Sequence, residues 1–196
     1  MSDLQIAPLT ARNWDHLAEL FSSGNPSFCW CAQWRGRGRT GSREQAEANR
    51  ALLRDLTERT DQGALSPGLV ATRHGLTVGW VSLGPREDYP RLMHSTVLAP
   101  LDERPVWSIV CFVVAKPARG QGVGTALLQA AIGYARDHGA TTLEAYPVDT
   151  SAGRVTAASA YAGTLPMFQQ AGFEVVTTRR ATPTSRPRPI VRLELT

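Results

Sequence analysis

The chain has 196 residues, of which 42% are hydrophobic and 19% are charged, and its formal net charge is +4. This length fits one domain that can bury a core without disulfides or metals. No apolar run reaches the roughly 18 residues of a membrane-spanning helix, and residues 1–8 are too few and too polar for a signal peptide. We therefore expect a cytoplasmic protein, with no membrane partner, that forms a single domain over residues 1–196.

The three cysteines, Cys29, Cys31 and Cys111, are too few for a disulfide framework, and their number is odd. Reduced thiols are the simpler expectation. The close spacing of Cys29 and Cys31 suggests half of a zinc site, but no second Cys or His pair follows to complete four ligands. We therefore expect no metal.

Nearly every cation of the chain is an arginine, because Lys116 is the only lysine. The clusters at 35–43 and 179–192 are interpreted as solvated loops, although arginine also pairs phosphates in bidentate fashion. An RNA-associated protein is therefore one alternative. The cluster at 35–43 has no confirmed platform of stacking aromatic residues, so nucleic acid is not the partner we expect.

Two helices are predicted near the start of the chain. The first begins at Thr10, a favourable N-cap that precedes an amphipathic pattern. The second opens with a capping box of Ser42 and Gln45 and ends near Arg59. We interpret residues 9–60 as this helix pair together with the aromatic, Gly- and Arg-rich loop that joins the helices.

Further along, strand-like apolar runs alternate with turn signals. The run at 106–114 is apolar throughout, as in a central strand buried on both faces. A broad amphipathic helix follows a glycine-rich turn, and Gly139 ends it. The other predicted elements are strands at 69–73, 77–83, 93–98, 141–146, 173–178 and 190–195, and a short helix at 165–171.

The glycine-rich turn is the most informative segment. It reads Arg119-Gly120-Gln121-Gly122-Val123-Gly124-Thr125 and leads directly into the helix. The first amides of a helix lack internal partners, and glycines let them approach an anion, so the turn predicts a pyrophosphate site. The turn does not match the dinucleotide-binding motif Gly-x-Gly-x-x-Gly, because Thr125 stands where the third glycine is needed. It does not match a Walker loop either, because no lysine stands at its end. A turn that only connects strand to helix is the structural alternative.

Arg119, Gly122 and Gly124 form the pattern Arg-x-x-Gly-x-Gly between a buried strand and a helix. A later strand, a short helix and the pair Gly172-Phe173 follow. This order resembles the acetyl-CoA signature of the GNAT superfamily of N-acyltransferases. The resemblance implies an α/β fold with a mixed, mostly antiparallel twisted sheet, flanking helices and two N-terminal helices.

The resemblance covers about residues 69–176 and implies that acetyl-CoA is the acyl donor. The end of the central strand would pair with the pantetheine arm as an added strand does, and the glycine-rich turn would wrap the pyrophosphate. The thioester would enter between the strands at 106–114 and 141–146. The residues implied in binding are Phe112, Val113, Val114, Arg119, Gly120, Gln121, Gly122, Val123, Gly124 and Thr125.

The usual acid and base of the resembled family are not in place. Ser108 stands at the position of the glutamate base, and Phe168 stands at that of the tyrosine acid. Tyr161 is the candidate acid, with a packed tyrosine as the alternative. Glu144 is the candidate base, with Asp149 beside it, although such carboxylates also bind substrate cations or face solvent. Positioning without a dedicated base stays open.

Trp30 and Trp34 are the candidate acceptor-binding residues, because their loop lies where the resembled fold covers its acceptor site and aromatic rings can enclose an amine. The alternative is that both rings pack the helix pair onto the sheet. The polar turn at 84–89 is a second candidate for acceptor contact.

Together these features predict an N-acetyltransferase that moves an acetyl group from acetyl-CoA to a primary amine of a small molecule or protein. The alternative is a non-catalytic domain that binds or senses acyl-CoA, which the missing glutamate and tyrosine favour. The resemblance also allows a homodimer.

Overall fold

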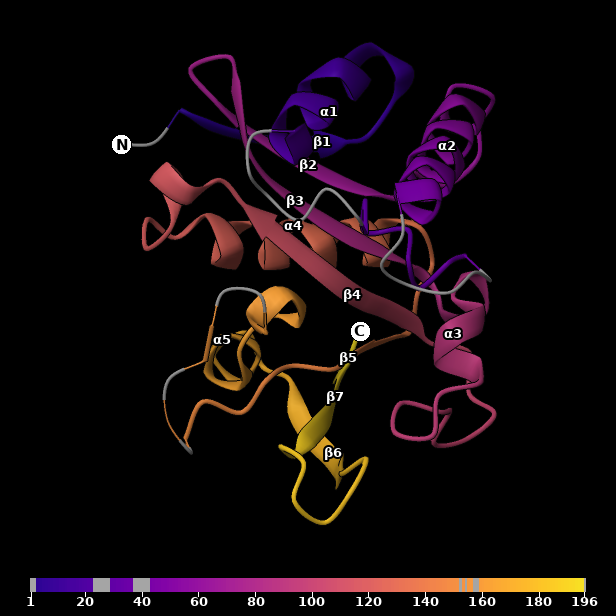
Figure 1. The fold of residues 1–196 in the computed structure, drawn as a ribbon, viewed down its shortest axis with the longest axis vertical. Coiled ribbons are helices and arrows are strands. Elements are labelled where there is room, and N and C mark those ends of the chain that lie inside the picture. Colours follow the sequence, from indigo (N-terminus) through magenta and orange to yellow (C-terminus); the bar gives the residue numbers. More distant parts are fainter. Residues whose placement is uncertain are drawn as a thin grey trace.

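The computed structural model describes residues 3–22, 29–36, 43–151, 153, 155–156 and 159–195. Within these residues, seven strands form one sheet in the order β1-β2-β3-β4-β5-β7-β6 (Figure 1). The strands are β1 (Leu4–Pro8), β2 (Gly68–Arg73), β3 (Leu76–Pro85), β4 (Trp107–Val114), β5 (Thr142–Ala145), β6 (Glu174–Arg179) and β7 (Arg188–Glu194).

Neighbouring strands pair antiparallel except for β4 and β5, which are parallel. A parallel pair needs a crossover connection, and the helix α4 (Val123–Asp137) supplies it. The hairpin of β6 and β7 adds to β5 through β7, so β6 lies at the sheet edge. The predicted mixed, mostly antiparallel sheet is confirmed.

Helices cover both faces of the sheet (Figure 1). One core cluster contains side chains of α4 and α5, and a second contains side chains of α1, α2 and α3. The two faces are distinct because alternate residues of a strand point to opposite sides. The α-helices are α1 (Trp14–Ser22), α2 (Arg43–Thr60), α3 (Pro90–Met93), α4 and α5 (Leu165–Gln170), and the 3-10 helices are η1 (Ala11–Asn13), η2 (Arg86–Asp88), η3 (Lys116–Ala118) and η4 (Ala160–Ala162).

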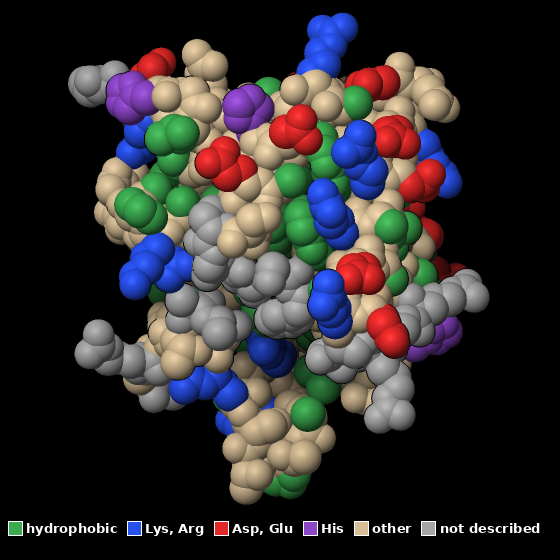
Figure 2. All heavy atoms as spheres, turned by 45° about the horizontal axis from the view of Figure 1, so that its top comes forward, with side chains coloured by type: hydrophobic (Ala, Val, Ile, Leu, Met, Phe, Trp, Pro, Cys, Tyr) green, Lys and Arg blue, Asp and Glu red, His purple; other side chains and the backbone are tan. Residues whose placement is uncertain are grey.

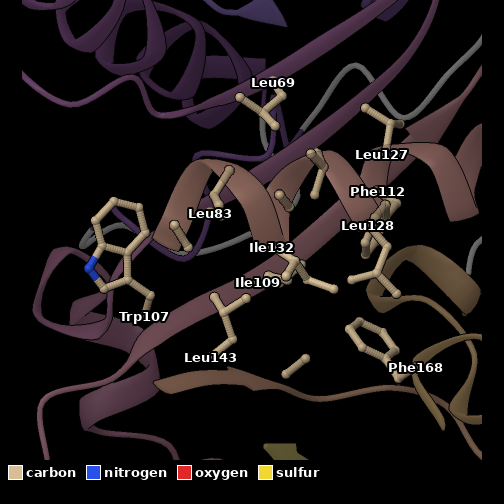
Figure 3. Close-up of a cluster of buried hydrophobic side chains, with 14 of the residues drawn as sticks. Leu69, Leu83, Trp107, Ile109, Phe112, Leu127, Leu128, Ile132, Leu143 and Phe168 are labelled. Atoms are coloured by element: carbon tan, nitrogen blue, oxygen red, sulfur yellow. The ribbon is translucent and has the colours of Figure 1, made fainter. Parts of the chain in front are cut away.

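The core under α4 sets the position of the glycine-rich turn. Leu127, Leu128 and Ile132 point from α4 onto Ile109 and the neighbouring strands (Figure 3). Gly79 of β3 permits this approach, because a Cβ there would lie 2.8 Å from Cγ1 of Val123 and 2.9 Å from Cδ1 of Leu127. The start of α4 is therefore packed tightly against the sheet.

Two predictions about elements were wrong or incomplete. The predicted strand at 93–98 is instead the end of α3 and a turn, because the Ser95 hydroxyl accepts the N–H groups of Val97 (3.3 Å) and Leu98 (3.0 Å). The edge strand β1 was not predicted, since it is short and mostly exposed. The other predicted helices and strands are confirmed with small shifts of their ends, and Gly139 follows α4 with a φ of +79°.

Some predictions fall partly outside the described residues. Ser42 of the predicted capping box is one of them, and α2 begins at Arg43. The arginine cluster at 35–43 is only partly described as well. The extent of a single domain over the whole chain stays a prediction.

The described surface over α2 mixes both signs of charge. The pairs Arg54–Glu58 and Asp55–Arg59 join side chains one helical turn apart at 2.9 and 2.7 Å. Figure 2 shows acidic and basic side chains interspersed on the side of the molecule that carries α2. Within the described residues, no helix combines the length and apolar character needed to cross a bilayer.

Candidate active site

The parallel strands β4 and β5 pair only over the first three residues of β4. Their pairing ends where Ile109 faces Ala145. On the other side of β4, the register with β3 shifts so that Ser82 faces Cys111 and Leu83 faces Ile109, which leaves Val110 as an extra residue. Such a bulge bends a strand and increases its twist. Within the described residues, no strand pairs with the β5-facing edge of β4 beyond Ile109.

The open edge of β4 leads directly to the glycine-rich turn. Gly120 and Gly122 have φ values of +74° and +78°, and a Cβ at either residue would meet nothing within 4 Å. The first hydrogen bond of α4 runs from Ala126 N–H to the Gly122 carbonyl at 3.0 Å. The amides of the first three helical residues therefore have no partner inside α4, and they form the positive end of the helix, which favours an anion.

Side chains fix the shape of this turn. Arg119 donates from Nε to the Val114 carbonyl at 3.1 Å, and Gln121 donates to the Pro117 carbonyl at 2.7 Å. Arg73 reaches across from β2 and donates to Oε1 of Gln121 at 2.6 Å. Two guanidinium groups are thus held on the turn, and both add positive charge.

Glu144 lies inside a network of charged residues rather than at a water-filled site. Its side chain is 1% exposed, and it accepts from Arg192 at 2.8 Å and from Arg86 at 3.4 Å. The Tyr146 hydroxyl also donates to it, at 2.8 Å. This geometry favours a structural role for Glu144, because both oxygens are engaged. Its role as a general base stays an untested prediction that the geometry does not support.

Ser108, at the position of the family's glutamate, joins the same network. Its hydroxyl lies 3.0 Å from that of Tyr146. Burial raises the pKa of Tyr146 well above its ordinary value, and the neighbouring Glu144 carboxylate raises it further. Tyr146 therefore stays protonated, and its hydroxyl links Ser108 to Glu144 through two hydrogen bonds.

Tyr161 lies on η4 and packs against the second core cluster, which contains side chains of α1, α2 and α3. Its side chain is partly buried, and burial raises the pKa of its hydroxyl, while nearby Arg188 lowers it. A tyrosine with a raised pKa is protonated at neutral pH, which is the form that a proton donor needs. Its catalytic role stays a prediction. Asp149, the alternative carboxylate, is partly buried and accepts the N–H of Ser151 at 2.8 Å.

The two tryptophans proposed for acceptor binding occupy different environments. The Trp30 ring is 6% exposed and stacks on Trp14 and Phe21, with ring centroids 5.9 and 5.0 Å away. This favours the packing interpretation for Trp30. Trp34 is less buried and packs at the margin of the same cluster. Its contact with an acceptor stays a prediction.

The fold also assembles groups that the sequence analysis did not bring together. Cys111 of β4 is buried in the same core cluster as Cys31, and Cys29 packs against that cluster. No sequence signal connects Cys111 to the other two, because they join one cluster only in three dimensions. The same is true of Asp102, which binds Arg192.

Comparison with known proteins decides the family. The model of the acetyltransferase (GNAT) family matches residues 32–162, which is most of the chain. The chain belongs to the GNAT family. It is therefore an acyltransferase with the acetyltransferase fold, as the glycine-rich turn predicted. Among curated protein sequences, none matches this GNAT protein significantly.

Solved structures of GNAT proteins share the fold at low identity. A polyamine N-acetyltransferase from Drosophila melanogaster is 13% identical, with a TM-score of 0.60 over 98% of this chain and 100% of the other. A putative acetyltransferase from Salmonella typhimurium, solved with its cofactor acetyl-CoA, is 17% identical, with a TM-score of 0.56 over 98% and 94%. A putative GNAT acetyltransferase from Desulfovibrio desulfuricans is 17% identical, with a TM-score of 0.57 over 98% and 99%.

Proposed function

We propose that this GNAT protein transfers the acetyl group of acetyl-CoA to a primary amine of a small molecule or protein. The main support for the proposal is that the open edge of β4 continues directly into the glycine-rich turn. The unpaired edge of β4 beyond Ile109 runs into a turn whose glycines have positive φ and open space beside them. An elongated ligand with a pyrophosphate at one end and amides along its arm matches this surface.

The residues present fit acetyl-CoA as the donor. The backbone of Phe112, Val113 and Val114 would pair with the pantetheine amides, in place of the missing strand. The amides of residues 119–125 would hold the pyrophosphate, with Arg119 and Arg73 adding charge. When bound, the thioester supplies the activated acetyl group.

In this proposal the protein positions the amine against the thioester and supplies a proton to the leaving thiolate. A neutral amine held against the thioester attacks without a dedicated carboxylate, because positioning lowers the entropic part of the barrier. Tyr161 would protonate the departing thiolate, which its raised pKa permits. Glu144 is not assigned a step, since two arginines and Tyr146 already engage it.

Small amines are the acceptor class that we favour. Structures with this fold include a polyamine N-acetyltransferase and an agmatine N-acetyltransferase. Trp34 is partly buried against the core cluster that contains side chains of α1, and it is the aromatic side chain that we assign to contact with such a cation.

A non-catalytic acyl-CoA sensor is the second candidate. The observation in its favour is that the family's two usual catalytic positions hold Ser108 and Phe168, while the nearest carboxylate, Glu144, is buried in an ion network. Thiol release from acetyl-CoA in the presence of amines would exclude this candidate.

The test is isothermal titration of the protein with acetyl-CoA, CoA, NADH and ATP. We expect acetyl-CoA and CoA to bind, and NADH and ATP not to bind. Gly122→Trp should abolish binding by filling the space beside the turn. Gly63→Trp is the matched control, because Gly63 also has a positive φ (+92°) and open surroundings but lies after α2. A folded protein that does not bind CoA would overturn the proposal.

A further inference from the structure

The segment between α1 and α2 is anchored at two points within its described residues, 29–36. At the first point, the Trp30 ring stacks on Phe21 of α1, with ring centroids 5.0 Å apart. At the second point, the Arg35 side chain reaches the end of β3 and the helix η2. Trp34, the side chain assigned to the acceptor amine, lies between these two anchors along the chain.

The Arg35 side chain is buried and donates to three acceptors. Its Nη1 donates to Oδ2 of Asp88 at 2.9 Å, and its Nη2 donates to the Leu83 carbonyl at 3.1 Å and to the Tyr89 hydroxyl at 2.8 Å. The side chain is only 5% exposed, so the prediction of a solvated loop at 35–43 is wrong for this arginine. A guanidinium held by several acceptors in a fixed geometry also fixes the main chain that carries it.

The surroundings of the guanidinium match its flat shape. Tyr89 is fully buried, and its ring centroid lies 4.3 Å from Cζ of Arg35, within the range of a cation–π contact. Gly84 of β3 leaves room on the sheet, because a Cβ there would lie 3.0 Å from Nη2 of Arg35 and 3.4 Å from Oδ2 of Asp88. A side chain at position 84 would therefore crowd the guanidinium.

The helix α3 binds the main chain on both sides of Arg35. The N–H of Arg91 donates to the Trp34 carbonyl at 3.3 Å, and Nε of Arg91 donates to the Gly36 carbonyl at 3.1 Å. Inside the segment, the N–H groups of Arg35 and Gly36 both donate to the Ala32 carbonyl at 2.9 Å. The backbone of Trp34 is thus held from two directions.

We propose that Arg35 is a positioning residue that latches this segment onto η2 and holds Trp34 in place for the acceptor amine. The inference rests on the proposed function, because Trp34 is the side chain assigned to the acceptor. It also joins the two acceptor candidates of the sequence analysis. Asp88 and Tyr89, the partners of Arg35, belong to the polar turn at 84–89, so this turn and the segment that carries Trp34 form one wall.

The latch acts by ordering the segment before the amine arrives. A segment that is already in place has no ordering cost when a ligand binds. If loss of the latch left the segment in its present position about a tenth of the time, the amine would bind about tenfold more weakly. The donor would be unaffected, because its proposed site is the edge of β4 and the glycine-rich turn.

Hydrogen exchange of the full chain tests the latch without any substrate. In Arg35→Gln, the amides of residues 32–36 and of Arg91 should exchange roughly tenfold faster than in the wild type, while peptides from α4 should keep their exchange rates. Arg59→Gln is the matched control, because Arg59 is exposed and pairs with Asp55 one helical turn away in α2. It should leave the exchange of residues 32–36 unchanged.

Thiol release with agmatine and spermidine as acceptor probes tests the placement at the acceptor site. Arg35→Gln should raise the KM for the amine about tenfold and keep kcat within about twofold, and titration should give the wild-type affinity for acetyl-CoA. Arg35→Lys keeps the charge but not the three contacts, so its KM should fall between the two. Gly84→Ala should raise the KM by crowding the guanidinium.

The outcomes separate the latch from the proposed function. Unchanged exchange of residues 32–36 in a folded Arg35→Gln protein would overturn the latch. Faster exchange with an unchanged KM, or a wild type that acetylates neither amine, would overturn its placement at the acceptor site. A wild type that does not bind acetyl-CoA would refute the proposed function, and hydrogen exchange would still decide the latch. If circular dichroism shows that Arg35→Gln does not fold, Arg35→Lys and Gly84→Ala provide both measurements.

Discussion

Arg192 of β7 holds Asp102 by two parallel contacts, from Nη1 and Nη2 to the two carboxylate oxygens at 2.6 and 3.0 Å. The same guanidinium donates from Nε to the buried Glu144 of β5 at 2.8 Å. Arg192 thereby joins β5, β7 and the segment before β4. Because β5 forms one side of the separation from β4, this ion network fixes one wall of the proposed donor site.

Replacing Arg192 by glutamine should destabilise the fold strongly. Glu144 would keep Arg86 and Tyr146 but lose its closest cation, and an incompletely paired buried charge costs about 3–5 kcal/mol. Urea unfolding measures the change. Arg104→Gln is the control, since Arg104 also contacts Asp102 but is half exposed, and its loss should cost about 1 kcal/mol or less. Equal effects of the two variants would contradict the assigned role of the network.

The Asp102 contact predicts an acid-sensitive part of the stability. Hydrogen bonds from Arg192 lower the pKa of Asp102 in the folded state below its ordinary value. The stabilisation is therefore fully present above the ordinary aspartate pKa of about 3.9, and it is lost as the pH falls from there through the folded-state pKa.

Unfolding free energies between pH 6 and pH 2 test this contribution. Asp102→Asn should show a shallower loss of stability below about pH 4 than the wild type. The difference should be small and should shrink in high salt, because the Asp102 side chain is 39% exposed. Parallel curves for the two proteins would show that Asp102 does not contribute.

Gly79 should be required for the position of the glycine-rich turn. Gly79→Ala places a Cβ within 3 Å of Val123 and Leu127, and overpacking of this kind costs about 1–3 kcal/mol. The start of α4 should shift, so acetyl-CoA affinity should fall along with stability. Gly133→Ala in α4, where a Cβ meets nothing within 4 Å, should instead be neutral or stabilising. Unchanged affinity in Gly79→Ala would show that the turn tolerates the shift.

Tyr161→Phe separates the catalytic role of this residue from a packing role. Loss of the hydroxyl should lower kcat about 100-fold, the lower range for a general acid, and should leave acetyl-CoA affinity and folding unchanged. Thiol release measures kcat, and titration measures affinity. In the wild type, the raised pKa of Tyr161 predicts no loss of activity from its ionisation below pH 10. A variant with full kcat would leave Tyr161 as a packed side chain.

The sequence by itself identified the features whose physics is local. Gly120 and Gly122 have positive φ, and the amides that follow lack partners because a helix begins there, so a short stretch of chain determines this anion-binding geometry. The strand at 106–114 is likewise recognisable from its continuous apolar run. These local signals were enough to predict the fold family.

Contacts between distant segments were decided only by the tertiary structure. Glu144 looked like an available carboxylate in the sequence, but Arg86 of η2 and Arg192 of β7 contact it, and its side chain is buried. The position of β7 between β5 and β6, and the burial of Cys111 in one cluster with Cys31, also depend on how the strands pair and pack. Strand pairing and burial depend on the packing of the whole sheet, so a short sequence pattern does not predict them.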